Sequence, residues 1–186
     1  MPDGVEDLRV RLGIQVAQGS VGVTRGTHLV DRVIQWGTSG RYNHAGVVVG
    51  LDEPTGWPLM VEASPEGATV GPVNPARFVF DAYALTRDQR MVVAASAWAC
   101  VGLPYDWRDI GRFIWRWRQA RRTGSMPDFS DDRVICSEIC AWALGRAGVD
   151  VKPGVAPGAV SPNDLADHML RYAGHSFTAP PGMMAR

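Results

Sequence analysis

The sequence predicts an α+β fold in which a small, mostly antiparallel sheet packs against a helix that carries a cysteine. Short apolar runs rich in β-branched residues, such as HAGVVVGL at residues 44–51 and LMVEAS at 59–64, have the length and composition of strands. The alanine-rich segments at 88–101 and 136–147 instead have the length and spacing of helices. Glycine and proline residues mark turns between neighbouring strands, which favours hairpins and an antiparallel sheet.

The size and composition fit one domain. The chain has 186 residues, of which 46 % are apolar and 20 % are charged, so it can bury a sizeable core. Its formal net charge is zero, which removes any overall electrostatic attraction to nucleic acid, an anionic membrane or an acidic substrate. We expect a single domain over residues 1–174 and a flexible tail, rich in proline, glycine and methionine, over 175–186.

The start of the chain bears on where the protein works. Residues 1–13 lack the apolar core of a Sec-type signal, and no run approaches the roughly 18 apolar residues of a membrane span. We therefore expect synthesis in the cytoplasm. The alanine- and arginine-rich composition suggests a high-GC genome, bacterial or phage, so a substrate outside the cell would be reached through a virion or through lysis.

The first half of the chain is expected to supply the sheet. Residues 5–23 hold short apolar pieces broken by glycines, which suggests an edge strand or a loop, and THLVDRVIQW at 27–36 places its apolar residues on one helical face. The run at 44–51 is apolar throughout, as in a strand buried on both faces, and the segment at 59–64 is interpreted as its returning partner. Further short strands are expected at residues 68–73 and within 78–86.

Helices are expected to dominate the second half of the chain. The helix at 88–101 should stop at Gly102, and SPNDLADHML at 161–170 has the signals of a later helix. Ser161 is the expected N-cap of that helix, and Asp164 places negative charge in the first turn, where the helix dipole favours it.

One pair of polar side chains follows from the predicted hairpin. Pairing Val47 with Leu59 places His44 directly opposite Glu62. Directly opposed residues of an antiparallel pair have Cβ atoms about 4.5–5.5 Å apart on one face of the sheet. A carboxylate at this distance can accept a hydrogen bond from an imidazole, so we expect Glu62 to orient the ring of His44.

Cys136 is placed in the first turn of its predicted helix. Small residues line one face of this helix, and Gly148 is suited to end it in the left-handed conformation. Unpaired backbone N–H groups and the positive end of the dipole stabilise a thiolate in a first turn. A buried structural cysteine is the alternative. The chain has three cysteines, and Cys140 lies only one turn from Cys136, so we expect reduced thiols rather than a disulfide.

Several short motifs resemble those of the NlpC-type papain-like cysteine peptidases. GLPYDW, which begins at Gly102, and VICSEICAWAL, which begins at Val134, resemble the GxPYxxG and DCSGLV motifs of that family. RYNHAGVVV and MVEAS resemble its histidine strand and the strand that follows. Because His44 precedes Cys136, the order resembles that of the circularly permuted branch, which includes the YiiX-like bacterial proteins and the lecithin:retinol acyltransferase-like proteins.

The YiiX-like group is the better match within that branch. Its histidine strand, EA dipeptide, G-x-PYD step, CSE helix start and late SPNDL-like helix are matched in order from about residue 20 to about residue 170. The resemblance therefore covers most of the chain, and it implies a permuted papain-like (NlpC-type) fold.

The resemblance also implies roles for individual residues. Cys136 would be the nucleophile, His44 the base and Glu62 the third polar member of the catalytic set. Tyr105 matches the tyrosine of the PY motif and would lie beside the cysteine. Tyr105 and Ser137 would help to bind the oxyanion or the substrate carbonyl.

The match departs from the family around the cysteine. The family's aspartate before the cysteine is Ile135 here, and Ser137-Glu138 stand in place of its SG. No second histidine or asparagine occupies the usual third place. Glu138 can be interpreted as a structural anion or as a catalytic one.

The expected activity is thiol-dependent acyl chemistry. The common substrate of the wider family is the peptide stem of the bacterial cell wall, so an amidase or endopeptidase is the first expectation. A lipid or acyl-ester hydrolase or acyltransferase is the second. A binding module that keeps the groove without turnover is the third.

A basic aromatic segment, DIGRFIWRWRQARR at 109–122, allows two further interpretations. It could bind nucleic acid through phosphate contacts and base stacking. We favour instead a helix that covers the groove with its aromatic face and turns its arginines to water, an anionic cell-wall polymer or lipid headgroups. The residues expected to make such contacts are Arg112, Trp115, Arg116, Trp117 and Arg118.

A zinc site could in principle be drawn from Cys136, Cys140 and a histidine. The chain lacks the CxxC and HxxxH spacings that such sites use, so we expect no metal and no other cofactor. His28 and His168 fall in predicted helices, and we place neither of them in the site.

Overall fold

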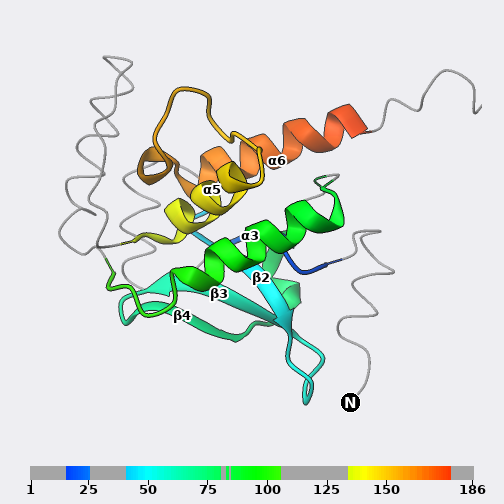
Figure 1. Cartoon of the computed structure of the whole chain (residues 1–186), viewed down its shortest axis with the longest axis vertical. Helices are drawn as coiled ribbons and strands as arrows, with labels where there is room; N and C mark the ends of the chain where they lie inside the picture. The colour runs from blue at the N-terminus through cyan, green and yellow to red at the C-terminus, as the bar shows by residue number, and fades with distance from the viewer. Residues whose placement is uncertain (1–15, 26–40, 81–82, 84, 106–133, 177–186) are drawn as a thin grey trace, which may run out of the picture.

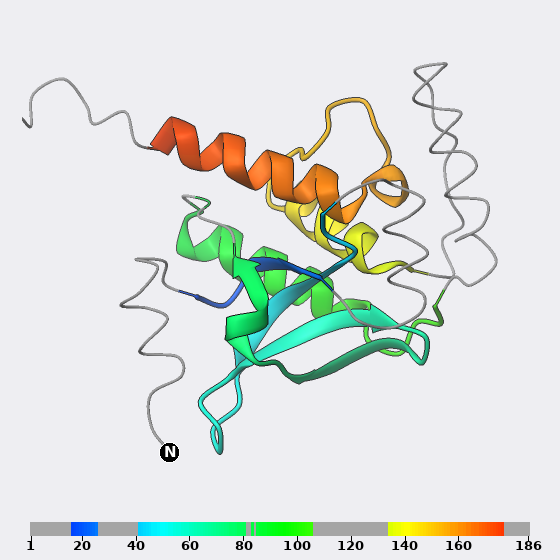
Figure 2. The ribbon, with the colours of Figure 1, turned by 180° about the vertical axis from the view of Figure 1, so that it is seen from behind.

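The computed structural model describes residues 16–25, 41–80, 83, 85–105 and 134–176. These residues form the predicted α+β architecture, a sheet with helices packed against one of its faces (Figure 1). The view from behind in Figure 2 shows the face of the sheet that these helices leave open. The helix expected at 27–36 lies outside the described residues.

The sheet has five strands in the order β4-β3-β2-β1-β5, and each neighbouring pair is antiparallel. The strands are β1 (Val21–Thr24), β2 (His44–Leu51), β3 (Pro58–Ser64), β4 (Gly67–Pro72) and β5 (Phe78–Phe80). The strands predicted from β-branched runs are therefore confirmed, as is the antiparallel sheet.

The expectation of an edge strand or loop before residue 24 is wrong. β1 lies between β2 and β5, and all four of its residues are buried. A Cβ on Gly22 would lie within 3.0 Å of the rings of Phe78 and Phe80 on β5. This glycine therefore permits close packing inside the sheet and does not interrupt a strand.

The two faces of the sheet carry different cores. Alternate residues of β2, including Ala45 and Val47, join the large core beneath α3 and α5. Val48 belongs to a small cluster on the opposite face, together with Met60 of β3. Because side chains alternate along a strand, His44 points to the same face as Val48.

Two helices cover the large core. α3 (Arg87–Ala99) and α5 (Cys136–Arg146) pack against each other and against β2, and both confirm predicted helices. Thr86 caps α3, because its hydroxyl accepts a hydrogen bond from the Gln89 N–H while its own N–H donates to the Gln89 side chain. Gly148, with a φ of 84°, follows the end of α5 in the left-handed conformation, as predicted.

The last helix, α6 (Pro162–Ser176), follows the 3-10 turn η2 (Pro157–Ala159). Ser161 is confirmed as its cap, since the Ser161 hydroxyl accepts a hydrogen bond from the Asp164 N–H at 3.1 Å. The Asp164 carboxylate accepts in return from the Ser161 N–H and also pairs with Lys152 at 2.9 Å. α6 continues to Ser176, two residues beyond the expected end of the domain at 174. No described helix has the length and apolar character needed to cross a bilayer.

An aromatic cluster holds α6 against the rest of the fold. The Tyr83 hydroxyl lies 2.7 Å from Nδ1 of His168, and the Tyr172 ring meets the Tyr83 ring edge-on with centroids 5.0 Å apart. Burial and the nearby positive charge of Arg171 lower the pKa of His168 below its ordinary value of 6.5, while Asp150 opposes them. Neutral His168 is therefore the form that suits the folded protein.

We expect the protein to lose stability as the pH falls below about 6.5, because the unfolded chain then binds a proton at His168 more readily than the folded chain does. Thermal denaturation from about pH 7 down to about pH 5 measures this loss. His168→Gln should flatten the dependence, since glutamine does not titrate. An equal slope in the two proteins would show that other groups cause the acid sensitivity.

Candidate active site

Two contacts fix the chain that leads into His44, the first residue of β2. Oδ1 of Asn163 in α6 accepts a hydrogen bond from the Tyr42 backbone N–H at 2.9 Å, and its Nδ2 donates to the Tyr42 carbonyl at 2.8 Å. The N–H of Asn43 donates to the Thr24 carbonyl of β1 at 3.2 Å. Asn163 therefore satisfies both backbone groups of Tyr42 as a neighbouring strand would.

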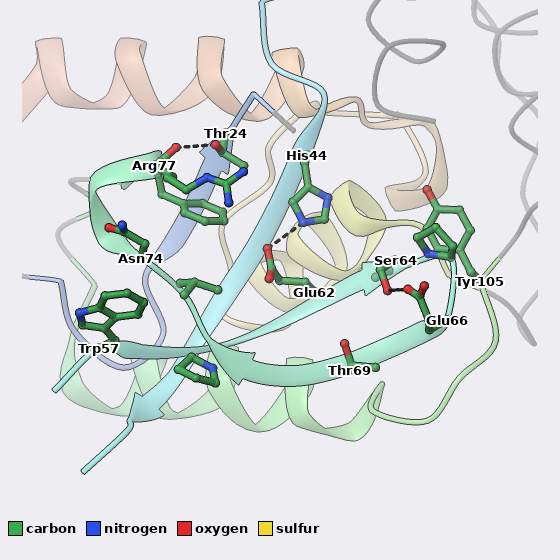
Figure 3. A pocket seen from close by; sticks show the side chains of 15 residues that line it. Thr24, His44, Trp57, Glu62, Ser64, Glu66, Thr69, Asn74, Arg77 and Tyr105 are labelled. Carbon is green, nitrogen blue, oxygen red and sulfur yellow. Dashed lines mark hydrogen bonds and ion pairs between the residues drawn. The ribbon is translucent and has the colours of Figure 1, made fainter. Parts of the chain in front are cut away.

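The imidazole of His44 is paired with the carboxylate of Glu62. His44 Nε2 lies 2.7 Å from Glu62 Oε1, and the two side chains are only 18 % and 23 % exposed (Figure 3). The predicted contact therefore forms, although the predicted register is wrong: Val47 pairs with Val61 and not with Leu59. Since a shift of two residues keeps each side chain on its own face, the pair becomes diagonal and remains in reach.

Gly46 allows this diagonal contact, and its role was not predicted from the sequence. Gly46 lies directly opposite Glu62 in the sheet. A Cβ on Gly46 would come within 2.9 Å of Cγ of Glu62 and Cε of Met60. The empty position therefore leaves room for the Glu62 side chain to lie across β2 toward His44. The sequence signal for this contact is a glycine that follows the strand histidine by two residues and therefore lies on the same face of the sheet.

Cys136 is the first residue of α5, as predicted. Just before it, the Ile135 N–H donates a hydrogen bond to the Glu138 carboxylate at 3.3 Å. This contact favours the interpretation of Glu138 as a structural anion that stabilises the start of the helix. Cys136 itself is a free thiol and is 3 % exposed.

His44 links the thiol to the carboxylate. Burial lowers the pKa of His44, yet hydrogen bonds to the Cys136 and Glu62 side chains, together with the negative charges of both, raise it to about 10. Nε2 is engaged with Glu62, so Nδ1 is the ring nitrogen left to face the sulfur. The arrangement therefore favours a protonated His44 ring at neutral pH.

The GLPY segment brings Tyr105 to the same place. Ala68 at the start of β4 donates its N–H to the Leu103 carbonyl at 2.9 Å and accepts from the Gly102 N–H at 2.8 Å. Tyr105 then forms a parallel bridge with Val134, two residues before the cysteine. These backbone contacts place the PY motif beside the approach to Cys136.

A cavity of about 520 Å³ opens on the face of the sheet that carries His44. Its wall includes His44, Glu62, Tyr105 and the apolar side chain of Trp57 (Figure 3). The apolar side chain of Phe78 also lines it. A cavity of this size can hold a small acyl or peptide group. The structure thus brings three of the five predicted site residues to this cavity, and Cys136 lies close enough to His44 to raise the pKa of the ring.

Ser137, the fifth predicted residue, does not line this cavity. It is 1 % exposed, and its hydroxyl has no hydrogen-bond partner among the described residues. The basic aromatic residues expected to contact a cell-wall polymer or a membrane lie outside the described ranges. These are Arg112, Trp115, Arg116, Trp117 and Arg118.

Comparison with known proteins identifies a similar fold. The chain resembles the crystal structure of the metalloprotein yiiX from Escherichia coli O157:H7, with a TM-score of 0.53 and 24 % sequence identity. The similar region covers 74 % of this chain and 70 % of that protein. No family model and no curated protein matches the chain. The structural likeness and the sequence resemblance therefore point to the same YiiX-like fold.

Proposed function

We propose that this protein is a thiol-dependent hydrolase of amide bonds with a permuted papain-like fold. The observation that carries the proposal is the position of His44, whose Nε2 lies 2.7 Å from Glu62 Oε1 and whose pKa is raised by both Cys136 and Glu62. A nucleophile, a proton carrier and a group that orients the carrier are the parts that acyl transfer by a thiol requires. The YiiX-like fold supports the proposal but does not by itself specify an activity.

In the proposed reaction the Cys136 thiolate attacks the carbonyl carbon of the substrate and forms a C–S bond. The N–H groups in the first turn of α5 stabilise the negative charge that develops on the carbonyl oxygen. His44 gives its proton to the departing amine as the C–N bond breaks. Neutral His44 then takes a proton from water, which hydrolyses the thioester and restores the imidazolium and thiolate.

The proposed substrate is the peptide stem of a bacterial cell wall, acted on by a protein of bacterial or phage origin. A second candidate is a lipid or acyl ester, which is favoured by the apolar side of the cavity around Trp57 and Phe78. Both candidates use the same nucleophile and differ in the group that leaves. A groove that binds without turnover is the remaining alternative.

The donor set does not fit a metal-dependent version of the reaction. Because the similar yiiX protein is a metalloprotein, His44, Glu62 and Cys136 are the natural residues to consider. Across residues 16–25, 41–80, 83, 85–105 and 134–176, no group of three His, Cys, Asp or Glu side chains could hold an ion. His44 and Glu62 are instead engaged with each other. The proposal therefore contains no metal-dependent step.

A covalent test does not require the natural substrate. We expect p-nitrophenyl acetate to acylate Cys136 at least about tenfold faster than Cys100, because acylation needs a thiolate and burial beside Glu138 raises the pKa of Cys100. Mass spectrometry of peptides after short incubation measures both sites. Equal acylation of the two thiols would contradict a nucleophilic role for Cys136.

The substrate is then assigned with cell-wall muropeptides and medium-chain acyl esters. The proposal predicts release of free amine from muropeptides by the wild-type protein and none by Cys136→Ala. If the protein hydrolyses the esters but not the muropeptides, the second candidate, a lipid or acyl-ester activity, would replace the proposed amidase. Amine release that survives Cys136→Ala would exclude thiol catalysis.

A further inference from the structure

One wall of the cavity carries a cation that the proposed reaction does not use. The 3-10 turn η1 (Pro75–Arg77) connects β4 to β5, and Arg77 lines the same cavity as His44 and Glu62. In Figure 3 the Arg77 head group points from η1 toward the part of the cavity where this pair lies. Within the described part of the chain, the guanidinium has no ion-pair partner.

Asn74 adds a second donor to this wall. Its Oδ1 accepts a hydrogen bond from the Ala76 N–H at 3.0 Å, which makes it the N-cap of η1. The Nδ2 group is not needed for this cap. Asn74 and Arg77 thus line the cavity from the two ends of one short turn.

The turn that carries these donors is anchored to the sheet. The Thr24 hydroxyl on β1 donates a hydrogen bond to the Arg77 carbonyl, and the Phe78 N–H closes the turn on the Pro75 carbonyl. Phe78 continues directly into β5, where its ring packs in the small core. Because its backbone is held in this way, Arg77 is presented from a fixed base and not from a free loop.

The charges nearby favour an anionic ligand over a cationic one. Glu62 and Glu66 are the acidic residues that line this cavity. The Glu62 carboxylate is paired with His44, and the Glu66 carboxylate accepts a hydrogen bond from the Ser64 hydroxyl at 2.6 Å. An arginine side chain is a cation whose planar fork matches a carboxylate or a phosphate, and Arg77 supplies such a fork to this cavity. A neutral ligand would leave this cation facing the cavity without a partner.

We propose that Arg77 and Asn74 form an anion subsite that binds a carboxylate of the substrate beside the scissile carbonyl. This inference rests on the proposed function, since the subsite is defined relative to the carbonyl that Cys136 attacks. It narrows the substrate class to acyl compounds with an acidic group near the reacting bond, such as peptides with a free or side-chain carboxylate.

The test compares two alkylating reagents that differ mainly in charge. Iodoacetate carries a carboxylate next to the carbon that the thiol attacks, whereas iodoacetamide is neutral. Arg77→Gln should lower the iodoacetate rate at Cys136 about fivefold and change the iodoacetamide rate less than about twofold. Arg77→Lys should keep most of the wild-type ratio of the iodoacetate rate to the iodoacetamide rate, because lysine keeps the positive charge.

Arg146→Gln is the matched control, because it removes the same charge at the far end of the helix that begins with Cys136. The ratio of the two rates should stay at the wild-type value in this variant. Loss of iodoacetate preference in both variants would overturn the subsite, because only net charge would then matter. An unchanged ratio in Arg77→Gln would also overturn it.

The outcomes separate this inference from the proposed function. If Cys136 reacts with neither reagent faster than Cys100 does, the proposed nucleophile fails, and the subsite fails with it. If Cys136 reacts with iodoacetamide but Arg77→Gln leaves the ratio unchanged, only the subsite fails. Protection of Cys136 by acetate, but not by inorganic phosphate at equal ionic strength, would support a carboxylate, and the reverse result would assign the site to phosphate.

Discussion

Replacing His44 with alanine is expected to slow the alkylation of Cys136 by iodoacetamide at neutral pH by on the order of 100-fold. The reason is that His44 holds the proton of the pair, with a pKa raised to about 10 by Cys136 and Glu62 against the opposing effect of burial. Without the ring, the sulfur must keep its own proton or lose the cation that stabilises its charge. Peptide mass spectrometry measures the rate, with Cys100 and Cys140 as internal references.

Two further variants make this result specific. Glu62→Gln should slow the alkylation of Cys136 by about tenfold or less, because glutamine can still hydrogen-bond the His44 ring but carries no charge. His168→Ala removes an imidazole outside the cavity and should leave the rate unchanged. Equal losses in His44→Ala and Glu62→Gln would give Glu62 a larger role than orientation, and an unchanged rate in His44→Ala would end the proposed pair.

Gly46→Ala is expected to damage both the fold and the site. The new Cβ would lie within 2.9 Å of Glu62 Cγ, Met60 Cε and the Val61 carbonyl oxygen. Since a backbone oxygen cannot give way as a side chain can, we expect a loss of about 1–3 kcal/mol in the free energy of unfolding. Displacement of Glu62 should also slow alkylation of Cys136 to the level of Glu62→Gln. Chemical denaturation and the alkylation rate measure the two effects.

Gly50→Ala is the matched control in the same strand. The atom nearest to a Cβ added at Gly50 would be Cδ1 of Leu59, at 4.0 Å, so the extra methyl group has room. We expect little change in stability or in the reactivity of Cys136. If Gly46→Ala lost stability but kept wild-type reactivity, the His44–Glu62 contact would not depend on the empty position at residue 46.

Local patterns were sufficient to predict most of the secondary structure. HAGVVVGL and MVEAS predicted β2 and β3 because β-branched runs of this length are typical of strands. The register of this pair was missed by two residues, because Leu51 pairs with Pro58 across the loop at 52–57, and local sequence does not fix where that loop closes. β1 was misjudged because Gly22 resembles a break until the rings of β5 are placed against it.

The site residues could be predicted where a family motif or the predicted hairpin singled them out. His44, Glu62, Cys136 and Tyr105 come from short segments that the family resemblance picks out, and the fold brings them together. Contacts across long sequence separations had no such signal. Asn163, which holds the chain before His44, lies 121 positions from Tyr42, and its role appears only when α6 is in place.

The proposed mechanism requires that the His44 ring, beside Cys136 and Glu62, is protonated at neutral pH. An NMR titration of the His44 ring in the wild-type protein and in Cys136→Ala measures this protonation. We predict that the wild-type ring stays protonated until about pH 10, and that the pKa of His44 falls when the sulfur is removed. A ring that titrates near its ordinary pKa of 6.5 in both proteins would contradict the account.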